Sequence, residues 1–314
     1  MSTQINTHTG TQRKTHTMKK IPKDRAAFII LAYAVIIIMT LFCVIPIIIV
    51  VSGSFTSESY ILKHGFSLFP KEFSTSAYVL AFKDPMVVFR AYGVTLFITI
   101  VGTLVGLFVT AMTAYVLTRK DFEWRNKFSF YFYFTTLFTG GLVPWYILMV
   151  RYLNMKNSYL ALIIPLLLSV FNILIMKSYM SSIPDAISES AKIDGAGDFT
   201  IFIKLILPLS KPALATVGLF IALRYWNDWY NAMLFIQDDK LYSLQYFLYK
   251  IVNNIDAYKN ILATSGGSVS VKMDLPSESL KMALTVIVTG PIILLYPFVQ
   301  KYFVQGLTIG AVKG

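Results

Sequence analysis

Three residue types on which many protein classes depend are scarce in this sequence: cysteine, histidine and charged residues. The single cysteine, Cys43, excludes an intrachain disulfide, which needs two thiols. The three histidines, His8, His16 and His64, stand at unrelated spacings, so we expect no metal site, which would need converging ligands. Charged residues make up 14% of the 314 residues, against about 25% in soluble domains. An ordinary soluble enzyme, a disordered protein and a disulfide-stapled scaffold are therefore excluded.

Apolar residues dominate instead. They account for 56% of the chain and give a mean hydropathy of +0.63, which is typical of a protein that lies in a lipid bilayer. The formal charge is nonetheless +12. In a soluble protein this balance would indicate nucleic acid, whereas in an apolar one it indicates anchoring by positive cytoplasmic loops. We therefore predict the bilayer, and no nucleic acid, as a partner.

Six apolar runs have about the length that a bilayer-crossing helix needs, which is roughly 20 residues. The third run contains Gly140, Gly141 and Pro144, and the fourth contains Pro165; membrane helices tolerate such residues because their neighbours satisfy the freed backbone. Long continuous runs exclude a β-barrel, which needs short alternating segments. We predict an all-α membrane protein with six transmembrane helices, at about residues 26–51, 92–117, 128–150, 158–176, 212–236 and 280–304.

The Lys and Arg residues between the runs predict the orientation. With the N-terminus inside, 16 of the 28 positive residues fall on the cytoplasmic side, where such residues accumulate. We therefore predict that both termini are cytoplasmic, with residues 1–25 as a flexible tail ahead of a membrane domain over residues 26–314. A signal peptide is the competing interpretation, but the apolar run is too long and lacks a cleavage site.

The cytoplasmic connection 177–211 has the pattern of a helix–turn–helix. Pro184 suits the first turn of a helix, and Asp185 complements its positive end. Gly195 and Gly197 would end this helix, and Asp198 can cap a second one.

One apolar ridge is expected on the first of these helices. Ile183, Ile187 and Ala191 repeat at four-residue spacing. The alternative is an amphipathic helix on the lipid surface, but such helices prefer large apolar residues with many Lys or Arg. We expect the small residues of the ridge to permit close approach of another protein's surface.

Residues 189–208 resemble the EAA loop of ATP-binding-cassette (ABC) import permeases, whose pattern is Glu-Ala-Ala, three residues, Gly, nine residues and Ile-x-Leu-Pro. The chain departs from the pattern conservatively, at Ser190 and Leu205. Three further segments are similar to carbohydrate-uptake permeases: 140–144, 181–184 and 296–314. The similarity is to the smaller membrane subunit of the maltose importer and to an oligosaccharide-uptake branch of Gram-positive bacteria.

The resemblance implies the type I ABC importer permease fold and a multi-pass subunit of the bacterial cell membrane, with 26–314 as the permease domain. In that family the loop, here 177–211, forms a coupling helix that docks on an ATPase subunit. A helix closed by a glycine turn can transmit rigid-body motion. The contact residues implied by the match are Glu189, Ser190, Ala191, Asp194, Gly195 and Ala196.

The energy source is expected on other chains. The sequence has no Gly-Lys dipeptide and hence no phosphate-binding loop, so we expect no enzyme activity and no cofactor in this chain. The resemblance implies that two partner ATPase subunits bind ATP and Mg, and that a second permease subunit completes a heterodimer. It also implies an oligosaccharide substrate and an extracellular solute-binding protein, which would meet the outer loops 52–90 and 237–279, the latter through residues 255–275.

For the translocation pathway the fifth run is the most informative, because charges at membrane depth normally face a bundle interior or a water-filled cavity. Arg224 and Asp228 lie four residues apart, so one helix face would carry both and they can neutralise each other. Trp rings can stack on sugars and Asn amides can bind them, although an interfacial aromatic belt and a structural ion pair explain the same residues. The pathway candidates are Trp226, Asn227, Asn231, Arg224, Asp228 and Trp145.

Two other functions compete. An ion-coupled secondary transporter would need buried carboxylates, and Asp228 is the only acidic residue deep in a run. A membrane-embedded enzyme would need clustered carboxylates or histidines in the runs, which the sequence lacks. The predicted function is a permease subunit of an ATP-driven, binding-protein-dependent oligosaccharide importer, with ion-coupled transport as the alternative. The sugar stays open: Arg224 suits an acidic oligosaccharide, and its expected pairing with Asp228 argues against one.

Overall fold

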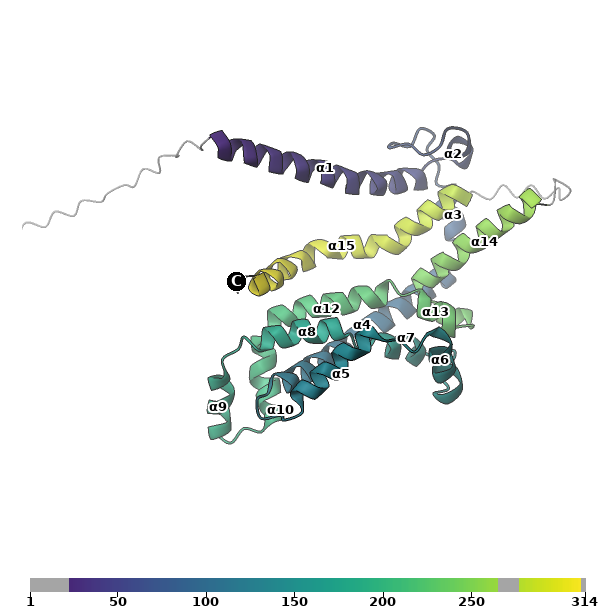
Figure 1. The fold of residues 1–314 in the computed structure, drawn as a ribbon. Helices are drawn as coiled ribbons and strands as arrows, with labels where there is room; N and C mark the ends of the chain where they lie inside the picture. The colour runs from purple at the N-terminus through teal and green to yellow at the C-terminus, as the bar shows by residue number, and fades with distance from the viewer. Residues whose placement is uncertain (1–22, 265–276, 312–314) are drawn as a thin grey trace, which may run out of the picture. The chain divides into compact units, whose positions relative to one another are not determined.

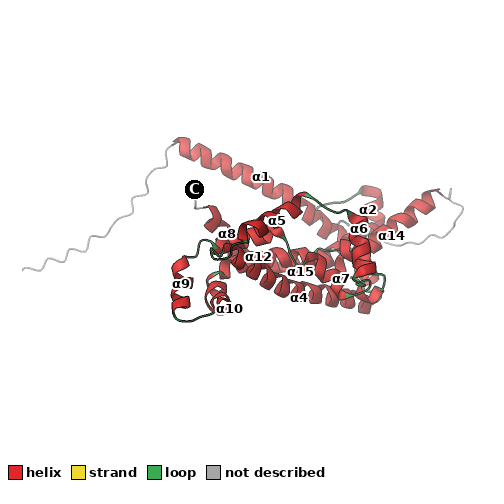
Figure 2. Ribbon diagram, turned by 60° about the horizontal axis from the view of Figure 1, so that its bottom comes forward, coloured by secondary structure: helices red, strands yellow, loops and turns green. Residues whose placement is uncertain are grey.

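The computed structural model describes residues 23–264 and 277–311, and over these ranges the regular secondary structure is helical (Figure 1, Figure 2). An isolated antiparallel bridge joins Thr56 to Phe73, and the described ranges contain no strand. The predicted all-α class is therefore confirmed.

The first helix, α1, runs over Lys23–Ser54. Its stretch Asp24–Ser54 is long and apolar enough to cross a membrane, as expected for the run 26–51. The chain divides into two compact units, residues 1–49 and 50–314, so the boundary falls inside α1.

Two more single helices pass the same test of length and composition: α4 (Pro85–Thr118) and α15 (Ser277–Ala311), the latter over Ser277–Leu294. Three further crossings would come from bent helix pairs, which makes six within residues 23–264 and 277–311 if each pair crosses once. The pairs are α5 (Arg125–Leu137) with α6 (Leu142–Ile147) and η1 (Leu148–Tyr152); α7 (Tyr159–Ile163) and η2 (Ile164–Leu166) with α8 (Val170–Met180); and Asp198–Leu209 with α12 (Lys211–Trp226).

The third run is bent by 113° between α5 and α6. The bend follows the Gly140-Gly141 pair, and Gly141 has a φ of +86°. Glycine adopts this conformation without the steric cost that other residues meet, so the glycines that interrupt the run also explain its bend.

The fifth run differs from the single helix expected over 212–236. Helix α12 ends at Trp226, and α13 (Tyr230–Phe235) begins after a three-residue break. Asp228 lies in this break and its carboxylate accepts the backbone N–H of Asn231 at 3.3 Å. The local hydrogen bond at the start of α13 competes with continuation of α12. This competition explains why two helices replace the single helix expected over 212–236.

Shorter helices complete the described chain. They are α2 (Glu58–His64), α3 (Ser76–Ala81), α9 (Asp185–Ile193), α10 (Asp198–Ile201), η3 (Phe202–Ile206), α11 (Leu207–Leu209), η4 (Asp239–Leu241) and α14 (Leu244–Thr264). Most of the tail predicted over 1–25, and part of the contact segment predicted over 255–275, fall on residues 1–22 and 265–276, outside the described residues.

The core lies where α4 packs along α8 and α12 (Figure 1). Gly102 of α4 lets the ring of Tyr225 approach so closely that a Cβ at position 102 would overlap it. The Tyr225 hydroxyl donates a 2.7 Å hydrogen bond to the Ile163 carbonyl. The close approach at Gly102 packs α12 against α4, and the hydrogen bond joins α12 to α7.

Candidate functional site

The predicted helix–turn–helix is present as α9 followed by a second helical stretch, Asp198–Leu209; we call residues 185–209 the helix–turn–helix segment. After α9, Gly195 has a φ of +81°. Gly195 N–H donates to the Lys192 carbonyl at 3.0 Å, and Ala196 N–H donates to the Ala191 carbonyl at 2.9 Å. This pair of bonds is a Schellman motif, so the expected glycine stop is confirmed at Gly195.

The second helix starts differently from the expectation. Gly197 occupies the N-cap position and Asp198 is the first helical residue, with no side-chain capping bond. The Asp198 carboxylate instead lies 3.1 Å from Arg119 and 3.5 Å from Lys192. The long cationic side chains compete for the carboxylate, which corrects its predicted role as a cap.

The apolar ridge of α9 also has a different partner from the one expected. Of the predicted ridge residues, Ile183 and Ala191 are half-buried and pack against the main core of this chain, as does Ala196 after the glycine turn. Ile187 is also half-buried. Ile183 and Ala191 therefore hold α9 on its own protein, which corrects the expectation that the ridge meets another protein at those positions. The exposed face carries Ile193, whose surface is 87% exposed.

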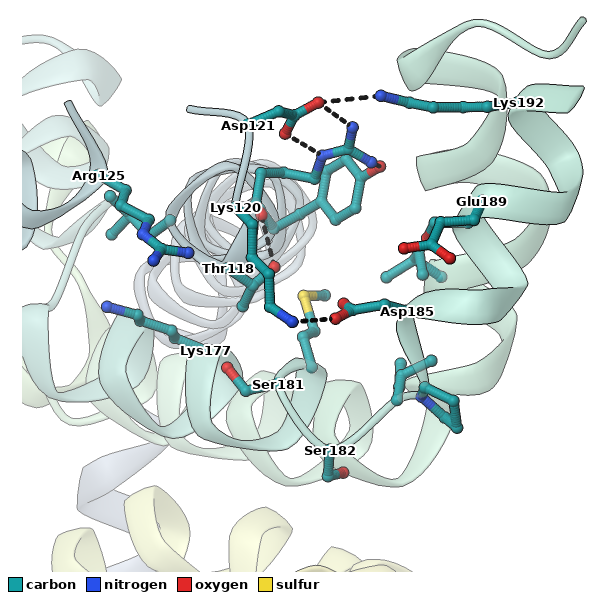
Figure 3. Close-up of a pocket in the computed structure, with 18 of the residues that line it drawn as sticks. Thr118, Lys120, Asp121, Arg125, Lys177, Ser181, Ser182, Asp185, Glu189 and Lys192 are labelled. Atoms are coloured by element: carbon teal, nitrogen blue, oxygen red, sulfur yellow. Dashed lines mark hydrogen bonds and ion pairs between the residues drawn. The ribbon is translucent and has the colours of Figure 1, made fainter. Parts of the chain in front are cut away.

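The other residues of the EAA-like match divide between these faces. Ala191 and Ala196 face the core, whereas Glu189, Ser190, Asp194 and Gly195 are exposed. Figure 3 shows that the Glu189 carboxylate points across a cleft beneath α9.

Four charged residues join α9 and α10 to the end of α4; we call Arg119, Asp121, Lys192 and Asp198 the charged cluster. Figure 3 shows Lys192 of α9 reaching Asp121. Arg119 binds Asp121 with two bonds, Nε to Oδ1 at 2.9 Å and a terminal nitrogen to Oδ2 at 2.5 Å. Lys192 Nζ donates to the same Oδ2 at 2.9 Å. Such a two-pronged arginine–carboxylate pair fixes geometry as well as energy.

Hydrogen bonds within the charged cluster favour the ionised forms of Arg119, Asp121 and Lys192. The hydrogen bonds from Arg119 and then Lys192 hold the pKa of Asp121 well below its ordinary value. The bond to Asp121 in turn raises the pKa of Arg119 and the pKa of Lys192. The side chain of Arg119 is only 15% exposed, so solvent screens it less than the others.

Lys120 makes a separate, exposed link to α9. Its Nζ lies 2.5 Å from Asp185, the first residue of that helix. The hydrogen bond to Asp185, with a smaller contribution from Glu189, raises the pKa of Lys120. The sequence predicts a topological role for Arg119 and Lys120 as positive cytoplasmic residues, and it predicts no role for Asp121. The signal that could have found them is an Arg-Lys-Asp run directly after an apolar helix.

A cleft of about 660 Å³ lies between these elements. Its walls come from the end of α4, the 119–126 connection, the end of α8 and the inner side of α9, and they are rich in charge (Figure 3). The charged residues lining it are Arg119, Lys120, Asp121, Arg125, Lys177, Asp185, Glu189 and Lys192. The arrangement joins α4, α8 and α9 to one another across the cleft.

Five of the six pathway candidates lie within residues 224–231, around the α12–α13 break. Arg224 is exposed near the end of α12, and no ion pair joins it to Asp228 in the described chain. The Asp228 carboxylate accepts the side-chain amide of Asn231 at 3.1 and 3.2 Å instead. The predicted neutralisation is therefore corrected: because α12 ends at Trp226, the four-residue spacing no longer places both charges on one helix face.

The rings and amides near this break also differ in exposure. Trp226 is only 5% exposed and packs with Ala91, Leu244 and Val288. Asn227 is exposed and accepts a 3.2 Å hydrogen bond from Gln245 of α14. Trp226 thus lies in a packed cluster, while Asn227 borders the surface.

Two candidates remain to be placed. Asn231 is buried, held by Asp228, and Trp145 lies half-exposed on α6. Trp229 belongs to the Trp rings that the sequence offers for stacking on sugars, and it stacks on Tyr249 of α14 with ring centroids 4.4 Å apart. The sequence interpretation missed Tyr249. The signal that could have found it is the spacing of tyrosines in the outer loop 237–279.

No group of three or more His, Cys, Asp or Glu residues that could hold a metal ion occurs within 23–264 and 277–311. This finding concerns those residues alone.

The chain has known relatives. Residues 89–309 match the family described as binding-protein-dependent transport system inner membrane component. The chain is 37% identical over 287 residues to the polygalacturonan/rhamnogalacturonan transport system permease protein YtcP of Bacillus subtilis, covering 91% of this chain and 98% of YtcP. It is 38% identical over 271 residues to protein LplC of the same organism, covering 86% and 90% of the two chains.

A solved structure has a similar fold. It is a chain of a bacterial ABC transporter involved in the import of the acidic polysaccharide alginate. The TM-score is 0.76 at 30% sequence identity, and the match covers 90% of this chain and 99% of the other.

Proposed function

Since the chain belongs to the family of binding-protein-dependent transport system inner membrane components, we propose that it forms half of the translocation pathway of an oligosaccharide importer. The chain is an ABC importer permease with the type I fold. The relatives do not favour the alternative of ion-coupled transport, because the matched proteins are ABC transport permeases.

The proposed substrate is an acidic oligosaccharide. The observation that carries this proposal is Arg224, an exposed cation at the α12–α13 break whose expected partner Asp228 is engaged by Asn231. A guanidinium can bind a uronate carboxylate with two parallel hydrogen bonds. The names of YtcP and of the alginate importer refer to acidic polysaccharides, which supports the same substrate class here.

The proposed energy coupling uses the exposed side of the helix–turn–helix segment. Ile193 and Asp194 lie outward on it, next to the rigid turn at Gly195. A large apolar side chain with a charged neighbour suits a protein surface better than bulk water. We propose that this side, with Ser190, docks on an ATPase subunit. Glu189 lines the cleft on the inner side of α9, and Ala191 and Ala196 pack the segment on the core of the chain.

The remaining parts of the importer follow as proposals. Two ATPase subunits bind ATP and Mg, and a second permease subunit forms the other half of a heterodimer. A solute-binding protein delivers the sugar from outside. The chain lies in the bacterial cytoplasmic membrane with both termini inside and residues 1–25 as a tail. The positive residues of the 119–127 connection and of the segment 177–211 support this orientation.

The test uses the complete importer in proteoliposomes, with its ATPase subunits and its binding protein. We expect uptake that needs hydrolysable ATP, and higher uptake of oligogalacturonate and alginate fragments than of neutral maltotriose. Failure of any ATPase to copurify with the chain would contradict the importer assignment. Equal uptake of acidic and neutral sugars would contradict only the substrate class.

Variants at the α12–α13 break test whether the oligosaccharide contacts residues there. Arg224→Gln should reduce uptake of the acidic fragments at least tenfold, whereas Arg90→Gln, which removes an exposed cation from α4, should not. Asn227→Ala should raise the apparent KM, because it removes an exposed amide. An unchanged KM and rate in both Arg224→Gln and Asn227→Ala would remove this break from the pathway.

A further inference from the structure

The helix–turn–helix segment has two kinds of connection to the rest of the chain. One is covalent, through residues 181–184 to α8 and through Ser210 to α12. The second of these junctions is bent by 85°, and α8 is itself bent by 51° from the preceding helix. Motion that travels along the chain must therefore pass through bends, which absorb displacement as hinges do.

The other connection is to α4 and does not follow the chain. Phe202 of η3 is buried against two rings of α4, Tyr115 at 5.3 Å and Phe108 at 6.1 Å between centroids. Half-buried Ala191 and Ala196 pack on the same core. Close-packed contacts of this kind transmit displacement because they cannot be compressed.

The charged cluster adds a directional link at the same place. Arg119 directly follows the last residue of α4, and its guanidinium contacts both Asp121 and Asp198. Lys192 of α9 reaches the same two carboxylates. Arg119 also donates to the Tyr115 hydroxyl at 3.1 Å, one turn back in α4. A network with a bidentate arginine at its centre holds geometry that an isolated surface pair does not.

Helix α4 is long enough to carry motion across the bilayer. Its 34 residues span about 50 Å at 1.5 Å per residue, more than the roughly 30 Å of the hydrocarbon core. It also contacts α15, where Tyr92 donates a hydrogen bond to the Ile287 carbonyl.

We infer that α4 carries the displacement of the helix–turn–helix segment to the opposite end of the bundle, and that Arg119, Asp121, Lys192 and Asp198 are the positioning residues that make it do so. The inference rests on the proposed function, because it assumes that an ATPase moves the segment. Without the charged cluster, the segment would move against α4 and the pathway would respond weakly to ATP.

The experiment measures motion at the end of α4 that lies far from Arg119. In a Cys43→Ser background, Met86→Cys places one thiol in the first turn of α4, where Met86 is 64% exposed. The complete importer, with its ATPase subunits, is labelled with a maleimide with and without ATP and vanadate. We expect the labelling rate to differ at least threefold between the two states.

The ratio of the labelling rates with and without ATP and vanadate is the readout. Asp121→Asn and Lys192→Met should each bring this labelling ratio close to one, while vanadate still traps nucleotide on the ATPase. The matched controls are Glu123→Gln and Lys127→Met, which remove exposed charges of the same sign close by, outside the charged cluster. Both controls should keep the ratio, and so should Lys192→Arg, which preserves the cation.

The inference is overturned if Asp121→Asn and Lys192→Met keep the threefold labelling ratio. It is also overturned if the Cys43→Ser, Met86→Cys protein labels at the same rate with and without ATP and vanadate. Because Lys192→Arg keeps a cation beside Asp121 and Asp198, loss of the labelling ratio in that variant also counts against the inference. Failure of the proposed function is distinct: no ATPase would copurify with the background protein.

Discussion

Glu58 and Ser279 lie 221 positions apart in the sequence and are joined by two hydrogen bonds. The Oε2 atom of Glu58 accepts the backbone N–H of Ser279 at 2.9 Å and its hydroxyl at 3.0 Å. The same carboxylate accepts the N–H of Glu278 and the hydroxyl of Ser277. An acidic side chain of α2 thus caps the N-terminus of α15, where backbone donors lack partners within the helix and favour negative charge.

Glu58→Gln should destabilise the protein by about 1–3 kcal/mol, because an amide nitrogen would face N–H donors that now bind an oxygen. The measurement is the thermal unfolding midpoint of the purified protein in detergent. Glu123→Gln, at an exposed position, is the control and should leave the midpoint unchanged. Equal midpoints for the two variants would show that the cap contributes nothing.

Gly195→Ala should loosen the end of α9. At a φ of +81° an alanine costs about 1–2 kcal/mol. Gly197→Ala is a matched control, since a Cβ meets open space at either glycine but Gly197 has an ordinary φ of −73°. Hydrogen exchange at Ala196 should accelerate at least fivefold in the first variant only. Equal acceleration in both would contradict the role of the left-handed turn.

Gly102→Ala should lower stability by about 1–3 kcal/mol, because the new methyl group would displace the fully buried ring of Tyr225. Gly93→Ala tests the same change elsewhere in α4, where nothing lies within 4 Å of the new Cβ. There the higher helix propensity of alanine should make the change neutral or stabilising. A stable Gly102→Ala protein would show that α4 and α12 can separate without cost.

The charged cluster should be insensitive to pH between about 5 and 9. The pKa of Asp121 lies below its ordinary value of 3.8, so its contribution is complete above that value and lost as the pH falls toward the folded pKa. The pKa of Lys192 lies above its ordinary value of 10.5, so its contribution is complete below 10.5 and lost as the pH rises through the folded pKa. Hydrogen exchange of residues 185–198, corrected for intrinsic rates, should show no step between these limits. A step near neutral pH would contradict the ionised cluster.

Much of the helix–turn–helix segment could be predicted from residues that act locally. Pro184 and Gly195 bound α9 through their own backbone preferences, which do not depend on distant contacts. Arg119 and Asp121 could not be found this way, because their significance arises only when Lys192, 71 positions beyond Asp121, is brought beside them.

The α12–α13 break shows the limit of helix spacing. Arg224 and Asp228 predict an i,i+4 pair only if one helix contains both. In the structure, Asn231 bonds Asp228 at the start of α13 instead, and no ion pair joins Arg224 to Asp228 among the described residues. A prediction from spacing therefore failed where polar side chains could bond the backbone.

By itself the sequence determined the membrane class, the helical runs and the EAA-like segment, because hydropathy and turn preferences are properties of short stretches. Only the tertiary structure decided which face of each helix is free. Ile183 and Ala191, two of the three residues in the ridge predicted to meet another protein, pack on the core of this chain, and Trp226 is buried beside Leu244. Burial depends on which helices come together, and a periodic pattern marks an apolar face without naming what covers it.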